Sequence, residues 1–476
     1  MLTYSFDSQV PGSMYEHLYR CIREDIVTGK LAAHEKLPSK RSFAKNLGVS
    51  NTTVENAYTQ LVIEGYLYAK PKRGFFVSAL DRQPKPPPPP PSRIAVTDRE
   101  RGDYFADLTD SGVAADLFPF SVWLRLLRQV MAVEDEKTLL TDRPAGGMLQ
   151  LREAIAEHLR AFRGMRVSPE QIIVGAGTEY LYSVLIQLLG RHRIYGVEDP
   201  GPLRLTRIYE RNDVDCRHIP LDEGGVHPRA LYESGAEVLH ITPSHHFPTG
   251  LVMPVSRRYE LLAWAAEGDG RYIIEDDYDC EFRLSGRPIP TFQSIDEGER
   301  VIYINNFSQS LAPAFRISYL VLPWHLVRRF YDTLGFDSGT VSCFEQLTLA
   351  RFLFEGHFER HINRMRNHYR FLRDSFISEI RRGPLGEYVQ ITQEDSGVHF
   401  LMKVNTYQTD VDLLQAAQAE GLRLSAVSQY YHDTGTREEH VLVINYSGLP
   451  AEKLPETARR LCRCILPREK WEERSG

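Results

Sequence analysis

Residues 301–323 read VIYINNFSQSLAPAFRISYLVLP, and they decide how the rest of the chain is interpreted. Residues 301–304 and 317–322 are apolar and rich in β-branched side chains, which predicts two strands. The loop between them holds small and polar residues and ends at Pro313 and Arg316. A polar loop beyond the end of buried strands is where α/β proteins bind ligands. The stretch therefore predicts a ligand site at the edge of a sheet.

Apolar strands alternate with helices N-terminal to this stretch. Residues 172–174 precede a Gly-x-Gly turn and a helix predicted over residues 180–189. Three further apolar segments are each followed by a loop rich in Gly, Pro or Asp: 195–197, 238–241 and 272–274. This alternation is typical of a parallel-rich sheet with helices on both faces. A smaller C-terminal α+β unit is predicted from about Phe336.

The segment from Ser308 to Arg316 resembles the S-x-S-K-x-L-x-P-x-x-R motif of the fold-type I aminotransferases, and residues 104–467 resemble their large and small domains. In that family the lysine holds pyridoxal 5'-phosphate (PLP) as a Schiff base, whereas this chain has Gln309. An amide nitrogen has its lone pair delocalised into the carbonyl, so it cannot form the imine or move the proton in transamination. No residue is therefore predicted to be catalytic, which argues against an enzyme.

The resemblance implies contacts to a cofactor held without a covalent bond. It assigns the PLP phosphate to the helix start at Gly177 and Thr178 and to Ser308 and Arg316, the pyridine nitrogen to Asp276 and the ring hydroxyl to Tyr278. It also places Arg204 where some relatives bind an effector carboxylate. A helix N-terminus and an arginine both suit an anion.

Four positions depart from the family pattern. Besides Gln309, Pro202 follows Glu-Asp-Pro-Gly where relatives place an aromatic residue against the ring. Asn306 replaces a Thr or Ser that often contacts the phosphate, and Val443 replaces an arginine that binds a substrate carboxylate. A change at Gln309 alone accounts for only one of the four, which favours drift away from covalent cofactor chemistry.

The first 80 residues predict a different kind of domain. Residues 14–28 place Leu18, Cys21, Ile22 and Ile26 on one helical stripe. Ser39 and Ser50 are predicted to cap two short helices, over residues 40–46 and 51–63, joined by a turn at Gly48. Two short strands, 65–69 and 75–77, then flank a basic tip. The block 31–77 is similar to the winged helix of the GntR superfamily.

A winged helix of this kind implies binding to double-stranded DNA. The start of its second helix would enter the major groove with Asn51, Thr52 and Thr53, where Asn can bond adenine and Thr can contact a thymine methyl. Phosphate contacts are predicted for the basic side chains around it, which are Lys40, Arg41, Lys45, Lys72 and Arg73. Residues 1–80 hold ten Lys or Arg and seven Asp or Glu, a net charge of +3 against −6 for the whole chain.

Composition sets the remaining limits. The 476 residues are 42% hydrophobic and 25% charged, without a stretch of the roughly 20 apolar residues that a membrane helix needs, so a cytoplasmic protein is expected. The six cysteines are scattered, and the adjacent His245 and His246 would point apart, so no metal site is predicted. Residues 84–92 read PKPPPPPPS, which predicts a stiff linker. The predicted parts are a winged helix (10–80), a proline-rich linker (81–103), a large domain (104–335) and a C-terminal part with the small domain (336–476).

A GntR winged helix followed by an aminotransferase-like domain is the arrangement of the MocR-type regulators. The resemblance implies a transcriptional regulator whose second domain forms a homodimer and senses an amine, an amino acid or PLP. Two alternatives stay open. One is a PLP-dependent aminotransferase that carries a winged helix, against which Gln309 argues, and the other is a cofactor-free regulator whose second domain is only a dimerisation scaffold.

Overall fold

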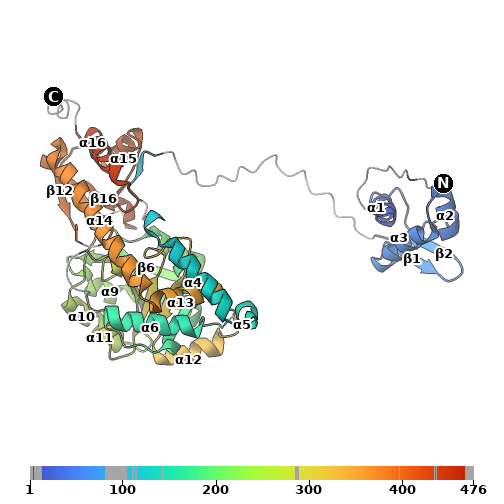
Figure 1. Ribbon diagram of the computed structural model, residues 1–476, viewed down its shortest axis with the longest axis horizontal. Coiled ribbons are helices and arrows are strands. Elements are labelled where there is room, and N and C mark those ends of the chain that lie inside the picture. The colour runs from blue at the N-terminus through green and yellow to red at the C-terminus, as the bar shows by residue number, and fades with distance from the viewer. Residues whose placement is uncertain are drawn as a thin grey trace. The chain divides into compact units, whose positions relative to one another are not determined.

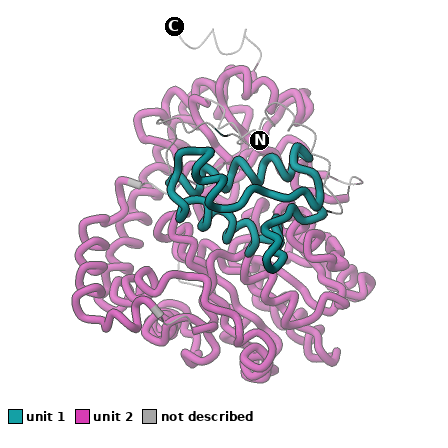
Figure 2. Tube along the Cα trace, turned by 90° about the vertical axis from the view of Figure 1, so that its right-hand side faces the viewer, with its two compact units in different colours: residues 1–100 teal, residues 101–476 magenta. Residues whose placement is uncertain are grey.

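The computed structural model describes residues 4, 13–80, 104–109, 112, 115–141, 144–284, 289–395, 397–433, 435 and 437–466. Its two compact units are residues 1–100 and residues 101–476 (Figure 2). The predicted linker, 81–103, lies outside the described residues. None of the helices in the described ranges is long and apolar enough to span a bilayer.

The first unit is a winged helix. Its elements are α1 (Met14–Val27), α2 (Lys40–Leu47), α3 (Asn51–Ile63), β1 (Leu67–Lys70) and β2 (Gly74–Val77) (Figure 1). The two strands form an antiparallel hairpin, and the apolar faces of the three helices pack into one core. Both predicted serine caps are confirmed: the Ser39 hydroxyl accepts from the Ser42 N–H at 3.2 Å and the Ser50 hydroxyl from the Thr53 N–H at 3.0 Å. Gly48 ends α2 in the left-handed conformation, with φ +67°.

An eight-stranded mixed sheet forms the centre of the second unit, in the order β4-β11-β10-β9-β8-β5-β6-β7. The strands from β10 to β6 run parallel, while β11 is antiparallel to both its neighbours and β7 is antiparallel to β6. Their bounds are β4 (Ile172–Gly175), β5 (Ile194–Asp199), β6 (Asp215–Asp222), β7 (Gly225–Val226), β8 (Val238–Ile241), β9 (Tyr272–Asp276), β10 (Val301–Asn306) and β11 (Ser318–Val321). The parallel-rich sheet predicted from the sequence is confirmed.

Helices cover both faces of this sheet because alternate residues of each buried strand point to opposite sides. Ile302 and Ile304 of β10 pack with the helices of one face, which are α7 (Thr178–Leu189), α8 (Leu203–Arg211) and α12 (Trp324–Thr333). Val301 and Tyr303 face the other side. That side is covered by α4 (Phe120–Val133), α6 (Leu149–Arg163), α9 (Pro228–Ser234), α10 (Val255–Glu267), α11 (Phe292–Ile295), α13 (Cys343–Phe354) and α14 (His357–Arg382).

A smaller sheet with helices follows α14. Its strands lie in the order β12 (Val389–Thr392), β13 (His399–Val404), β16 (Val441–Asn445) and β15 (Ser425–Ala426), and it packs with α15 (Asp410–Ala419) and α16 (Leu454–Ile465). A separate pair joins β14 (Leu422–Arg423) to β3 (Ala106–Asp107) in parallel. The segment just after residue 103 is therefore part of this C-terminal layer.

Short elements connect these layers. The helix α5 (Glu136–Thr141) lies between α4 and α6, and the 3₁₀ turns are η1 (Ala115–Leu117), η2 (Pro169–Gln171), η3 (Cys280–Phe282), η4 (Pro384–Glu387), η5 (Val427–Tyr430) and η6 (Ala451–Lys453).

Candidate functional site

A cavity of about 260 Å³ opens at the carboxyl ends of β5, β8, β9 and β10. This is the edge of a parallel sheet at which α/β proteins place their ligands. The helices α7 and α8 close it from one side. The lining residues are Thr178, Glu179, Tyr182, Glu198, Pro202, Arg204, Leu205, Ile208, His240, Thr242, Phe247, Asp276, Tyr278 and Asn306.

Asp276 is a buried acceptor on the wall of this cavity. Its side chain is held from one side, because Oδ2 accepts a hydrogen bond from the Tyr182 hydroxyl and lies 3.6 Å from Nε2 of His240. Its other oxygen, Oδ1, is buried and has no hydrogen-bond partner among the described residues. A buried carboxylate oxygen without a donor is costly. The cavity therefore offers an acceptor to a ligand that brings an N–H or O–H group.

Two further titratable groups of the wall respond to burial. Oε2 of Glu198 accepts from the backbone N–H and from the hydroxyl of Thr242, both at 2.8 Å. Burial nevertheless raises the pKa of Glu198 to about 7, because desolvation penalises the charged form. Burial, followed by the nearby carboxylates of Asp279 and Asp276, raises the pKa of Tyr278 well above its ordinary value. Tyr278 is thus a neutral phenol at any physiological pH.

Glu179 lies between two arginines at the mouth of the cavity. One of its carboxylate oxygens pairs with Arg204 and the other with Arg316. The Arg316 guanidinium lies over Gly177, since a Cβ added to that glycine would be 3.0 Å from the Arg316 Cζ atom. Gly177 precedes α7 with φ +92° and ψ 159°, a conformation that is essentially restricted to glycine. The start of α7 is therefore a cationic region that already holds one carboxylate.

The predicted cofactor contacts do not all lie in one place. Thr178, Asp276, Tyr278 and Arg204 line the cavity, and Gly177 and Arg316 border it through their contacts with Glu179. Ser308 and Gln309 lie in the loop after β10, half-buried, and are not among the described residues that line the cavity. The part that each predicted residue plays in binding stays a prediction.

The positions that depart from the family pattern have a structural counterpart. Pro202 and Asn306 line the cavity. Val443 is buried in β16 with Leu401, Val427 and Val441, and Phe247 of the cavity wall packs against this cluster. An arginine at residue 443 would have to place its charge among these apolar side chains, so valine suits the packing.

The residues present fit a pyridine ring with a phosphate arm, bound without a covalent bond. The unpartnered Oδ1 of Asp276 suits a protonated ring nitrogen. The start of α7, with Thr178 and Arg316 beside it, suits an anionic group. Gln309 excludes attachment through an imine.

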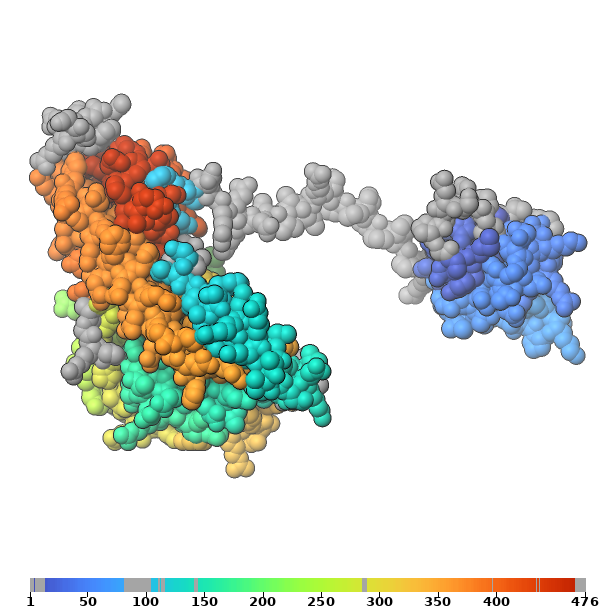
Figure 3. Space-filling view, in the orientation of Figure 1, coloured from blue at the N-terminus to red at the C-terminus, as the bar shows by residue number. Residues whose placement is uncertain are grey.

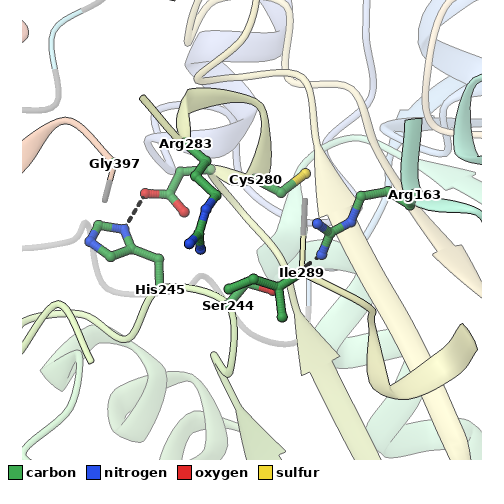
Figure 4. Close-up of a pocket in the computed structure, with 8 residues that line it drawn as sticks. Arg163, Ser244, His245, Cys280, Arg283, Ile289 and Gly397 are labelled. Carbon is green, nitrogen blue, oxygen red and sulfur yellow. Dashed lines mark hydrogen bonds and ion pairs between the residues drawn. The ribbon is translucent and has the colours of Figure 1, made fainter. Parts of the chain in front are cut away.

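A second, much smaller cavity is lined in part by the segments that follow β8 and β9. It measures about 20 Å³ and is lined by Arg163, Ser244, His245, Asp279, Cys280, Arg283, Ile289 and Gly397 (Figure 4). The Nδ1 atom of His245 lies 2.6 Å from Asp279 Oδ2, and Arg163 pairs with Asp277 at 2.7 Å. A space of this size holds about one water molecule. The two contacts hold the segment that follows Asp276, and the cavity leaves no room for an organic ligand.

The neighbouring histidines do not form a metal site. Nδ1 of His246 lies 2.7 Å from the Thr249 hydroxyl, while His245 turns to Asp279. Within the ranges that the structure describes, no group of three His, Cys, Asp or Glu side chains could hold a metal ion.

Reasoning from the sequence missed several polar residues of the cavity, among them Glu179, Tyr182, Glu198 and His240. Tyr182 follows Thr178 by four residues on α7, and this helical spacing could have placed it on the same face. His240 stands in an otherwise apolar strand, which also marks it. Nothing in the sequence indicated that Glu179 would pair with both Arg204 and Arg316.

The candidate DNA-binding surface is on the first unit. Arg41, Lys45, Asn51 and Thr52 are exposed around the start of α3, whereas Val54, Ala57, Tyr58 and Leu61 of that helix are buried. Lys72 and Arg73 are exposed at the tip between β1 and β2, where Lys72 has φ +60°. These side chains form two exposed groups that a DNA duplex can reach.

Two of the predicted DNA contacts have intramolecular partners. Lys40 forms an ion pair with Glu55 of α3, with 2.6 Å between Nζ and Oε1. Thr53 is half-buried, and its hydroxyl lies 2.8 Å from the Ser50 hydroxyl that caps the helix. Exposed ion pairs contribute little, so a phosphate can compete for Lys40. The Thr53 hydroxyl, by contrast, is already engaged with the Ser50 hydroxyl at the helix cap.

Known proteins resemble this chain in both of its units. Residues 14–77 match the model of the gntR family of bacterial regulatory proteins. The chain is 36% identical over 457 residues to the uncharacterized HTH-type transcriptional regulator YdeL of Bacillus subtilis, covering 94% of this chain and 96% of that protein.

Two other relatives carry functional names. The probable rhizopine catabolism regulatory protein MocR of Rhizobium meliloti is 30% identical over 484 residues, covering 98% of this chain and 97% of that protein. The HTH-type pyridoxine biosynthesis transcriptional regulator PdxR of Corynebacterium glutamicum is 33% identical over 431 residues, covering 89% of this chain and 90% of that protein. Among solved structures, kynurenine aminotransferase of Pyrococcus horikoshii matches with a TM-score of 0.66 and 24% identity, covering 77% of this chain and 91% of that chain. The second unit therefore has the aminotransferase fold.

Proposed function

The chain belongs to the MocR-type transcriptional regulators, which join a GntR helix-turn-helix domain to an aminotransferase-like domain, and on this basis we propose that it binds operator DNA as a homodimer and responds to a small ligand in the cavity of its second unit. The proposed ligand is PLP or a related phosphorylated pyridine, held without a covalent bond. One relative, PdxR, is named as a regulator of pyridoxine biosynthesis, which agrees with a ligand of this class.

The observation that carries the proposal is the polarity of the cavity. On its wall, Asp276 has a buried carboxylate oxygen without a hydrogen-bond partner among the described residues, and Arg204 and Arg316 both pair with Glu179 at the start of α7. A ligand with a protonated ring nitrogen at one end and a phosphate at the other satisfies both. An apolar cavity that served only as packing would contain neither.

The side chains around the cavity supply positioning, and no chemistry is proposed for them. Tyr182 holds one oxygen of Asp276, and the other has no partner among the described residues, so it can accept from a ligand. Phe247 and Ile208 supply apolar surface for the faces of a ring. In the related enzymes PLP supplies an electron sink when it is bound to lysine, and this chain has no lysine in the matching position. Ligand binding would therefore be a signal.

An exposed apolar surface supports the proposed homodimer. Phe120, Met131 and Val133 of α4 and Leu140 of α5 are exposed, and Phe336 and Phe354 before and at the end of α13 are 82% and 85% exposed. These helices pack together, as residues of α4, α5 and α13 share a hydrophobic cluster, and α4 and α5 lie at the surface in teal (Figure 3). Exposed apolar side chains on adjacent elements are typical of an interaction surface. A second copy of this chain is the proposed occupant.

The direct test is a titration of the purified full-length protein with PLP, followed by calorimetry and then by borohydride reduction and mass measurement. Saturable binding without a covalent adduct is expected. The Gln309→Lys variant is the matched comparison, because a lysine there can form a reducible adduct if the ligand lies as proposed. Failure of the folded wild-type protein to bind PLP would refute the proposed ligand. It would favour a second unit that serves only as a dimerisation scaffold.

A further inference from the structure

The anion-binding end of the cavity is occupied by a side chain of the protein itself. Glu179 is the second residue of α7, a helix of twelve residues, and its carboxylate pairs with both Arg204 and Arg316. A Cβ on Gly177 would be 3.2 Å from the Glu179 Oε2 atom, so the carboxylate lies over the start of the helix. The positive end of the helix stabilises a negative charge in this position.

The rest of the cavity indicates that this end belongs to a ligand. Asp276, which is 7% exposed, lines the same cavity with its unpartnered Oδ1. Thr178, the first residue of α7, also lines it. A ligand that reaches from Asp276 to the start of α7 would bring its anionic group to the two arginines with which the Glu179 carboxylate now pairs.

From this geometry we infer that Glu179 is an internal competitor, which gives up Arg204 and Arg316 to a phosphate monoester and not to a carboxylate. The inference rests on the proposed function, because it assigns the anionic group of the ligand bound there. A carboxylate ligand would exchange one single negative charge for another and gains nothing over Glu179. A phosphate monoester carries a charge of roughly −1.5 to −2 and three acceptor oxygens, so it binds the two arginines more strongly than the Glu179 carboxylate does.

The test compares wild type with Glu179→Gln by calorimetry, using PLP, inorganic phosphate and pyridoxal, which lacks the phosphate. Glutamine keeps the size of the side chain and removes its charge. The control is Glu157→Gln, which makes the same change of net charge at an exposed helical ion pair with Arg160 outside the cavity. Thermal unfolding checks that each variant is folded.

The expected result is that Glu179→Gln binds PLP and inorganic phosphate about 3- to 30-fold more tightly than wild type, the range that loss of two partly exposed ion pairs predicts. Pyridoxal should bind wild type and variant equally, and Glu157→Gln should behave as wild type.

Two results would overturn the inference in distinguishable ways. Equal binding of PLP to wild type and Glu179→Gln, or an equal gain for pyridoxal, would show that Glu179 does not compete for the phosphate while the proposed ligand stands. No binding of any probe to any folded variant would remove the proposed ligand together with the inference.

Discussion

Replacing Gly177 by alanine tests whether the start of α7 is shaped around Arg316. Gly177 has φ +92° and ψ 159°, where an L-residue costs about 1–3 kcal/mol. The new Cβ would also meet the Arg316 guanidinium, 3.0 Å from its Cζ atom, and would force it away from the helix. The variant should therefore lose stability and, in addition, its contact with an anion.

Gly164→Ala separates these two effects. Gly164 ends α6 with φ +68°, and a Cβ there would have no heavy atom within 4 Å. This control should lose about 1 kcal/mol, since only the backbone is strained. In urea unfolding we expect Gly177→Ala to lose at least as much as Gly164→Ala.

Anion binding provides the second readout. In calorimetry with PLP, Gly177→Ala should bind about tenfold more weakly, because one charge-assisted contact is displaced. Gly164→Ala should bind as wild type. If Gly177→Ala binds PLP as tightly as Gly164→Ala does, the position of Arg316 over Gly177 does not contribute to anion binding.

Three further predictions concern other parts of the molecule. Arg41→Ala should weaken binding to all DNA sequences and flatten its salt dependence, whereas Asn51→Ala should mainly relax base preference. If both variants lose affinity equally for operator and random DNA, the start of α3 does not read bases in the major groove. Burial raises the pKa of Glu198 from 4.5 to about 7, so the folded protein takes up a proton there and its unfolding free energy falls as pH rises through this window. Glu198→Gln should remove up to about 3 kcal/mol of that fall, measured as the difference from wild type in urea unfolding at pH 5 and pH 8, and an unchanged difference would contradict it. Val133→Glu should weaken a dimer about tenfold or more in sedimentation, whereas Val411→Glu, at a similarly exposed valine of α15, should leave it intact.

Local patterns in the sequence predicted most of the fold because the chemistry of caps and strands is local. Ser39 and Ser50 cap the helices that follow them, as expected for a serine just before an apolar helical stripe. The strand β8 has the predicted bounds, Val238–Ile241. Other expectations failed where packing decides. Cys21 was expected on the buried stripe of α1 but is half-buried, while Asp25 is buried there because it accepts a hydrogen bond from the Tyr4 hydroxyl at 2.7 Å.

The site could be predicted in part, through residues that lie in strand ends and helix starts. Asp276 and Thr178 follow from their places at the end of β9 and the start of α7. The pairing of Glu179 with Arg204 and Arg316 could not be predicted, because these residues come from three segments and meet only after the sheet has formed. The direction of a long charged side chain is set by its neighbours in space, which the sequence does not contain.

The pairing of β3 with β14 has a consequence for synthesis on the ribosome. Arg423 on β14 donates to Asp107 on β3, 316 residues earlier in the chain. The described core and hairpin of the winged helix lie within residues 4–80, so this unit can fold as soon as it has emerged. The strand β3, near the start of the aminotransferase-like unit, cannot pair with β14 until residues 422–423 have left the ribosome. Each nascent chain can therefore complete its winged helix long before its aminotransferase-like unit can be completed.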